Sequence, residues 1–145
     1  MSYLAIDNGA KNIGIAIADK SGIAVKPLGV VNNNNSDYTF AQIDNYIGEW
    51  HSDHVITGLP LNAEGEETVN CKIIRKFINK LVLKSTYKFK IDFYPEYFST
   101  SFSTQGLSRK NKQAMGDAYA AAYILKKYLE WQSEKSALKL IAPLT

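Results

Sequence analysis

The chain has 145 residues, of which 46% are hydrophobic and 21% are charged, so it can form one globular domain and is not intrinsically disordered. The net charge of +3, with basic residues that are mostly lysine, permits nucleic acid as a partner but does not require it. One cysteine, Cys71, rules out an internal disulfide framework, and no apolar run approaches the ~18 residues of a membrane span. We therefore expect a cytoplasmic protein.

Three apolar segments with turn residues between them begin the chain and predict strands over 3–7, 13–18 and 24–31. The link over 8–12 contains Asn and Gly and is short enough for a hairpin. Pro27 interrupts the third segment, and because proline cannot donate a backbone hydrogen bond, this strand should lie near the edge of a sheet. In the polar run NNNNSD that follows, Ser36 or Asp37 would cap a helix.

Helices and strands alternate in the rest of the chain. Apolar residues at helical spacing predict helices over 38–50, 67–84 and 114–131, and short buried or alternating runs predict strands over 54–61 and 88–93. In the second helix the residues expected to face the core are Val69, Ile73, Ile74, Phe77, Ile78 and Leu81, with a row of lysines facing outward. Residues 99–113 are expected to be a polar loop, and residues 132–145 a short helix with a loose tail.

The order β-β-β-α-β-α-β-α is typical of an α/β protein with a mixed five-stranded sheet and helices on both of its faces. We expect one domain over residues 1–131 and a C-terminal tail over 132–145. In sheets of this kind, functional sites gather at strand ends near the point where the strand order changes.

Three acidic residues at the ends of predicted elements are the best candidates for such a site. Asp7 ends the first strand, Glu96 follows the fifth, and Asp117 lies in the first turn or two of the last long helix. Hard cations such as Mg²⁺ take carboxylate oxygens, so these acids and substrate phosphates could complete a metal site. Taken singly, each has an ordinary alternative: a turn residue, a solvated loop acid and an acid that favours the helix dipole.

Four segments of the chain resemble the YqgF/RuvX family, in the same order and with compatible spacing. AIDNGAKNIGIAIAD is similar to the family's D-x-G-x-K-R-I-G-V-A hairpin, and VITGLPLNAEGEET to its G-L-P-L-N-x-x-G-x-E-T signature, the most specific match. PEYFST lies where the family has D-E-R-x-[ST]-T, and GDAYAAAYILKKYL resembles its closing helix. The resemblance covers about residues 3–129.

This resemblance implies a ribonuclease H-like fold and a nuclease that uses Mg²⁺ or Mn²⁺, with Asp7, Glu96 and Asp117 as the catalytic and metal-binding acids. The family is described as maturing the 5′ end of precursor 16S ribosomal RNA, which we expect here, or as resolving four-way DNA (Holliday) junctions. Nucleic acid is therefore the expected partner, the ribosome is a further candidate, and the chain would act as a monomer or a homodimer. The residues expected to hold the substrate are Lys11 and Asn62 in the matched motifs and Arg109, Lys110 and Lys112 in the basic segment SRKNKQ.

Two departures from the family pattern keep other interpretations open. Asn12 replaces the arginine after the hairpin lysine, and Pro95-Glu96-Tyr97 replaces the D-E-R triplet, which keeps the central acid but loses an acid and an arginine. A non-catalytic RNA- or ribosome-binding module with a degenerate site is therefore one alternative. An ATP-dependent sugar or acetate kinase-like fold, whose phosphate loop also begins D-x-G, is another, but such enzymes need two domains of this kind.

Overall fold

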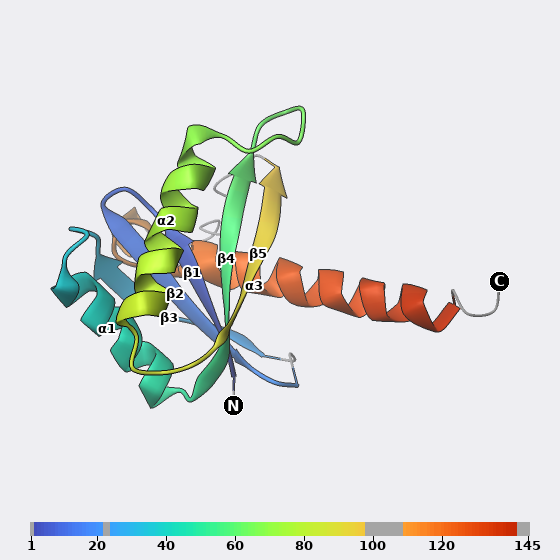
Figure 1. The fold of residues 1–145 in the computed structure, drawn as a ribbon, viewed down its shortest axis with the longest axis horizontal. Coiled ribbons are helices and arrows are strands. Elements are labelled where there is room, and N and C mark those ends of the chain that lie inside the picture. The colour runs from blue at the N-terminus through green and yellow to red at the C-terminus, as the bar shows by residue number, and fades with distance from the viewer. Residues whose placement is uncertain (1, 22–23, 98–108, 142–145) are drawn as a thin grey trace.

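The computed structural model describes residues 2–21, 24–97 and 109–141 and is built around a five-stranded sheet (Figure 1). The strands lie in the order β3-β2-β1-β4-β5. Their bounds are β1 Ser2–Asn8, β2 Asn12–Asp19, β3 Val25–Asn32, β4 Ser52–Leu61 and β5 Lys90–Tyr97. The first three pair antiparallel, whereas β4 pairs parallel with both β1 and β5. The predicted mixed sheet is confirmed, and so is the edge position of the strand that contains Pro27.

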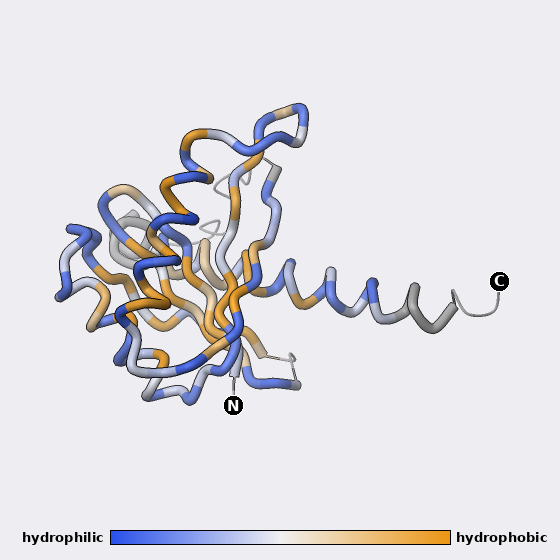
Figure 2. Tube along the Cα trace, in the orientation of Figure 1, coloured by the Kyte–Doolittle hydropathy of each residue, from blue (hydrophilic) through white to orange (hydrophobic). Residues whose placement is uncertain are grey.

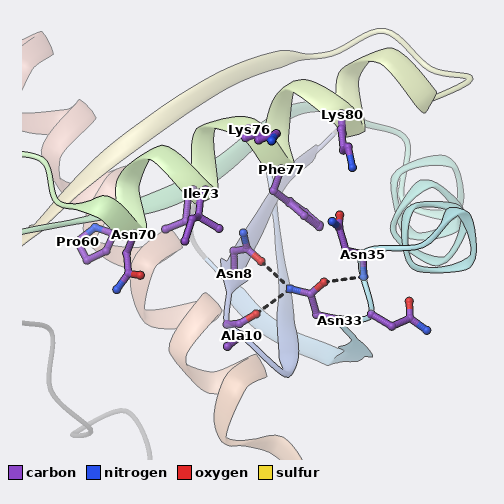
Figure 3. A pocket seen from close by; sticks show the side chains of 13 residues that line it. Asn8, Ala10, Asn33, Asn35, Pro60, Asn70, Ile73, Lys76, Phe77 and Lys80 are labelled. Atoms are coloured by element: carbon purple, nitrogen blue, oxygen red, sulfur yellow. Dashed lines mark hydrogen bonds between the residues drawn. The ribbon is translucent and has the colours of Figure 1, made fainter.

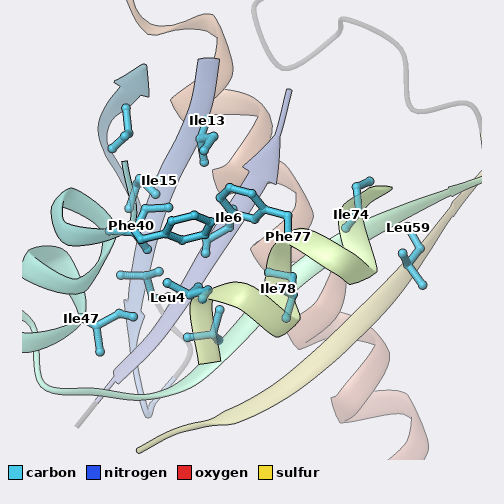
Figure 4. Packing of buried hydrophobic residues seen from close by; sticks show 14 of the residues in the cluster. Leu4, Ile6, Ile13, Ile15, Phe40, Ile47, Leu59, Ile74, Phe77 and Ile78 are labelled. Carbon is cyan, nitrogen blue, oxygen red and sulfur yellow. The ribbon is translucent and has the colours of Figure 1, made fainter. Parts of the chain in front are cut away.

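The helices cover both faces of the sheet, as predicted. Helices α1 (Asp37–Glu49) and α2 (Val69–Lys84) pack on one face, and α3 (Arg109–Ile141) packs on the other (Figure 1). Strand alternation divides the core accordingly: Leu4 and Ile6 of β1 pack with α1 and α2, whereas Ala5 packs with α3. Figure 2 shows hydrophobic residues concentrated where the strands cross the middle of the molecule, and Figure 4 shows Phe40 stacked on Phe77 between the two helices.

Helix α3 approaches the sheet unusually closely. An ideal Cβ built on Gly14 of β2 would lie 1.7 Å from the backbone oxygen of Asp117 and 2.8 Å from the backbone nitrogen of Ala118. Ala118 and Ala121 are fully buried in this interface. Small residues on both elements therefore let the helix backbone lie directly against the strand, and this contact fixes the position of Asp117.

Several predicted boundaries were wrong. Helix α3 begins at Arg109 and continues unbroken to Ile141, so it includes part of the predicted loop and much of the predicted tail. The last part of α3 extends beyond the sheet (Figure 1). The predicted end of the domain at residue 131 therefore stays a prediction. Glu96 lies within β5 and not after it. Within the described residues, no helix combines the length and apolar character that a membrane crossing requires.

The core face of α2 also differs from the prediction at its first turns. Val69 and Ile73 are 72% and 57% exposed, whereas the other four predicted core residues of this helix are buried. Cys71 is fully buried instead, and its thiol donates to the backbone oxygen of Pro60 at 3.0 Å. The helix is therefore rotated relative to the predicted face, and Ile73 points towards a pocket that is described below.

Candidate active site

Asp7 and Glu96 lie on the same face of the sheet, beneath α3. In the parallel pairs, Ile6 aligns with Thr57, and Gly58 aligns with Tyr94. Because side chains alternate along each strand, Asp7 shares the face of Ala5, which packs with α3. Glu96, two residues beyond Tyr94, lies on that face as well, since Tyr94 also packs with α3.

Gly58 leaves the space that the Glu96 carboxylate fills. An ideal Cβ on Gly58 would lie 2.2 Å from Glu96 Oε2 and 2.7 Å from Glu96 Cδ. The side chain of Glu96 therefore lies over β4 at the one position where that strand has no side chain. Glycine is needed here because of this close approach.

We expect Gly58→Ala to reduce metal binding and cleavage strongly while changing the melting temperature by only a few degrees. The methyl group would collide with the end of a flexible side chain, so the fold can relax by moving the Glu96 carboxylate away. Thermal melts with and without Mg²⁺ measure the melting temperature and the metal binding, and a cleavage assay measures the activity. Because Gly58 would act through Glu96, adding Gly58→Ala to Glu96→Gln should cost little more, and additive losses would contradict this account.

Asp117 is placed beside Asp7 by the close contact between α3 and β2. Asp7 pairs directly with Gly14 across the β1–β2 hairpin. Gly14 is also the residue whose missing side chain admits the backbone of Asp117. The helix therefore places Asp117 against Gly14, the residue that pairs with Asp7. Since α3 begins at Arg109, Asp117 lies beyond the first two turns, which argues against a role at the helix start.

The electrostatics of Asp7 show that the charges of Glu96 and Asp117 reach it. Burial, and to a smaller extent the negative charges of Glu96 and Asp117, together raise the pKa of Asp7 from 3.8 to about 7. Burial also raises the pKa of Asp117. Like charges at a partly buried site favour protonated carboxyl groups or a bound cation.

The donor set fits a hard divalent cation. Three carboxylates supply only oxygen ligands, which suit Mg²⁺ or Mn²⁺, and a cation would relieve the repulsion that Asp7 experiences. Among the described residues, however, no three His, Cys, Asp or Glu side chains already stand in an arrangement that holds a metal. Binding a cation would therefore draw the carboxylates closer together.

The predicted substrate residues fall in different parts of the structure. Lys11 is exposed at the tip of the β1–β2 hairpin. The side-chain oxygen of Asn62 accepts from the backbone nitrogens of Glu64 and Glu66 at 3.0 and 2.8 Å, so this residue organises the loop after β4. The backbones of Arg109, Lys110 and Lys112 form the start of α3, but their side chains lie outside the described part. Their roles in binding remain predictions.

Sequence reasoning missed two features on the α3 side of the sheet. Gly14 gave a signal, a glycine inside an apolar strand, which often marks a close backbone approach. The other feature is a polar cluster in which His54 Nε2 lies 2.8 Å from Asp92 Oδ2, and the hydroxyl of Tyr128 donates to the same oxygen at 2.5 Å. Burial and this carboxylate raise the pKa of Tyr128. The cluster ties α3 to β4 and β5.

Comparisons with known proteins match almost the whole chain. The family model of RuvX, described as a Holliday junction resolvase, matches residues 1–131. A protein of Paraburkholderia phymatum, named "Putative pre-16S rRNA nuclease", is 31% identical over 130 residues, which cover 89% of this chain and 85% of the relative.

Solved structures agree on the fold. The fowlpox virus Holliday junction resolvase has a TM-score of 0.53 at 17% identity, and the likeness covers 91% of this chain and 99% of that chain. RuvC of Thermus thermophilus has a TM-score of 0.52 at 11% identity, with 92% and 97% covered. These likenesses show a ribonuclease H-like fold. With the family match over residues 1–131, the chain therefore belongs to the RuvX family, a family of hydrolases that act on phosphodiester bonds.

Proposed function

We propose that this chain is a metal-dependent nuclease that matures the 5′ end of precursor 16S ribosomal RNA, with Asp7, Glu96 and Asp117 as its catalytic and metal-binding acids. The observation that carries the proposal is that the charges of Glu96 and Asp117 both raise the pKa of Asp7, near the end of the central strand. Two close contacts support it: Gly14 admits the backbone of α3 at Asp117, and Gly58 leaves space for the carboxylate of Glu96.

Each acid has a defined task in this mechanism. Asp7, on the central strand, would hold the cation, while Glu96 and Asp117 would complete its oxygen ligands from either side. The bound Mg²⁺ or Mn²⁺ would supply an activated water and charge stabilisation for the leaving oxygen. Lys11 at the hairpin tip, with Arg109, Lys110 and Lys112 at the start of α3, would neutralise phosphates of the strand.

Precursor 16S ribosomal RNA is preferred as the substrate for two reasons. The P. phymatum relative, which is 31% identical, is named as a nuclease of pre-16S rRNA. The net charge of only +3 also suits a limited phosphate footprint, as on one strand of a structured RNA. A four-way DNA junction is the second candidate, because the family model and a neighbour in fold are described as junction resolvases.

Asp117→Asn should abolish metal-dependent cleavage and leave the apo protein at least as stable as the wild type. The reason is that burial already makes the ionised carboxylate unfavourable, as its raised pKa indicates. Mg²⁺ should raise the wild-type melting temperature, since a ligand at 100 times its Kd adds ~2.7 kcal/mol to the free energy of unfolding. The Asn variant should gain much less from the same Mg²⁺.

Glu130→Gln is the matched control for this measurement. Glu130 is an exposed acid on the same helix, about 20 Å along the axis from Asp117 at ~1.5 Å per residue. Its substitution removes one negative charge but should leave the Mg²⁺ response unchanged. Equal Mg²⁺ shifts for the wild type and Asp117→Asn would remove Asp117 from the site.

Cleavage of two labelled substrates separates the alternatives. The precursor RNA spanning the 5′ end of 16S and a four-way DNA junction are incubated with the protein in Mg²⁺ or Mn²⁺. Cleavage of the RNA at the mature 5′ end is the expected result. Symmetric cutting of the junction without action on the RNA would favour the resolvase, for which a dimer is expected. Binding without cleavage of either would favour a non-catalytic module.

A further inference from the structure

A pocket of about 800 Å³ opens on the α2 side of the sheet, next to the strand that carries Asp7 (Figure 3). Its walls are the end of β1 at Asn8, the link at Gly9 and Ala10, the segment 33–35 and one side of α2. We call it the asparagine pocket, because five of its lining residues are Asn8, Asn33, Asn34, Asn35 and Asn70.

Some of these amides build the pocket and others are available to a ligand. Asn33 Nδ2 donates to Gly9 O at 2.8 Å and to Asn8 Oδ1 at 3.3 Å, which ties the segment 33–35 to the hairpin. In the described part of the chain, Asn8 Nδ2 and the side-chain amides of Asn35 and Asn70 have no hydrogen-bond partner. Each amide group can both donate and accept, which is the pattern that the edge of a nucleic acid base requires.

The charge of the asparagine pocket is positive. Lys76 and Lys80 of α2 line it, and neither forms an ion pair with another described residue. No Asp or Glu is among its lining residues. The same wall carries Ile73, which is 57% exposed, beside Phe77. Free amides, unpaired lysines and an exposed apolar surface together match an unstacked base and its phosphates.

We propose that the asparagine pocket binds an unpaired nucleotide of the substrate strand, with the free amides contacting the base and Lys76 and Lys80 the adjacent phosphates. This proposal rests on the proposed nuclease function and deepens it by assigning the substrate a single-stranded segment beside the cleaved bond. A base in a duplex presents its edge only within a groove, so a pocket with walls from the hairpin link, the segment 33–35 and α2 suits a base that is unpaired.

The position of the pocket connects it to the catalytic acids. Asp7 faces α3 and its neighbour Asn8 lines the asparagine pocket on the opposite face, with their Cα atoms about 3.8 Å apart. A strand held at the three acids can therefore pass over the hairpin tip at Gly9 and Ala10 and enter the pocket within a few nucleotides. The exposed Lys11 lies at this same tip.

Equilibrium binding in EDTA, where cleavage is blocked, tests the proposal without relying on activity. The probes are a fluorescent unstructured oligoribonucleotide, its DNA counterpart and a blunt duplex of the same sequence. The wild type should bind either single strand more tightly than the duplex. The double variant Lys76→Ala/Lys80→Ala should weaken single-strand binding roughly tenfold and reduce the magnitude of its salt slope by ~1.4, at ~0.7 per lost phosphate contact.

Two further variants make the test specific. Lys88→Ala/Lys90→Ala removes two exposed lysines at the other end of the sheet and should leave binding unchanged. Asn70→Asp is isosteric and suits the first turn of α2, so it should keep the melting temperature but weaken single-strand binding. Equal effects of the two lysine pairs, or duplex binding as tight as single-strand binding, would overturn the proposal.

The two proposals fail in distinguishable ways. If the wild type cleaves precursor RNA but the pocket variants bind single strands like the wild type, the asparagine pocket is not used and the nuclease function stands. If the wild type binds single strands through the pocket but cleaves nothing in Mg²⁺ or Mn²⁺, the pocket proposal is supported and the nuclease function fails. Absence of single-strand binding by the wild type overturns the pocket proposal directly.

Discussion

Asp7→Asn is expected to make the apo protein more stable at pH 8 than the wild type while reducing cleavage by several orders of magnitude. Asn keeps the shape of the side chain but cannot carry the charge that a divalent cation needs. The same charge opposes folding when no metal is bound, because it is partly buried beside two other carboxylates. Loss of function combined with gain of stability is therefore the signature of this site.

The expected pH dependence follows from the direction of the pKa shift. The folded state holds the Asp7 proton up to a pH of about 7, whereas the unfolded state releases it near 3.8. Between these values the folded state binds more protons, so the free energy of unfolding falls as the pH rises, by ~1.4 kcal/mol per pH unit from this group. The full cost, on the order of 4 kcal/mol, is reached above pH 7.

Urea unfolding of the wild type and Asp7→Asn at pH 4 and pH 8, both in EDTA, measures this effect. The two proteins should have similar stability at pH 4, which is so close to the unfolded-state pKa of 3.8 that little of the cost has yet appeared. At pH 8 the Asn variant should be more stable by a few kcal/mol. A variant that is less stable than the wild type at pH 8 would mean that Asp7 serves folding, as a turn residue would.

Gly14→Ala is expected to have the largest effect on stability of any single methyl group added to the sheet. The new Cβ would lie 1.7 Å from the backbone oxygen of Asp117, and a backbone atom cannot rotate away as a side chain can. Helix α3 would have to lift from β2, at a cost at or above the usual ~1–3 kcal/mol of overpacking. We expect the melting temperature to fall by about 10 °C, since 1 kcal/mol corresponds to ~2–4 °C at this size.

Gly29→Ala is the control for this substitution, because it adds the same methyl group to the neighbouring strand. Its Cβ would meet the hydroxyl oxygen of Tyr46 at 2.6 Å, the far end of a half-buried side chain that can move. It should therefore cost less than Gly14→Ala. Gly14→Ala should also lose the Mg²⁺ response, since it moves Asp117, whereas Gly29→Ala should keep it. Equal melting temperatures for the two variants would contradict the close helix contact.

The sequence predicted the elements well where periodicity is strong. The alternation and apolar runs of β1, β2 and β4 located these strands to within two residues, and Ser36 caps α1 as one of the two predicted residues. Pro27 correctly placed β3 at an edge, because the missing donor is a local property of the chain. The order of the strands was not predictable in this way, since it depends on which strands pair in space.

The wrong predictions also have physical reasons, which lie in how the elements pack together. Val69 and Ile73 fit the helical period, but the first turns of α2 turn Cys71 and Ile74 towards the core instead, so Val69 and Ile73 are exposed. The start of α3 was placed too late because its first residues are polar, and a helix there gains little from an apolar face. Glu96 was assigned to a loop because Pro95 precedes it, yet β5 is an edge strand and tolerates proline.

The site itself was only partly predictable. Each acid had an ordinary alternative when taken singly, and the resemblance to a family was needed to group them. What the sequence could not show is how Gly14 and Gly58 make room for Asp117 and Glu96, because this depends on the contacts between elements. The asparagine pocket was not foreseen either, since its walls come from four separate segments and its lysines were interpreted as a solvated helix face.

The most direct test of the three-acid site is cleavage of the precursor 16S RNA by the wild type and by Asp7→Asn, Glu96→Gln and Asp117→Asn, under single-turnover conditions in Mg²⁺. The wild type should cut the RNA at the mature 5′ end and lose this activity in EDTA. Each variant should be inactive although it is folded, as its melting temperature will show. Metal-independent cutting by the wild type, or wild-type rates in any one of the three variants, would contradict the site.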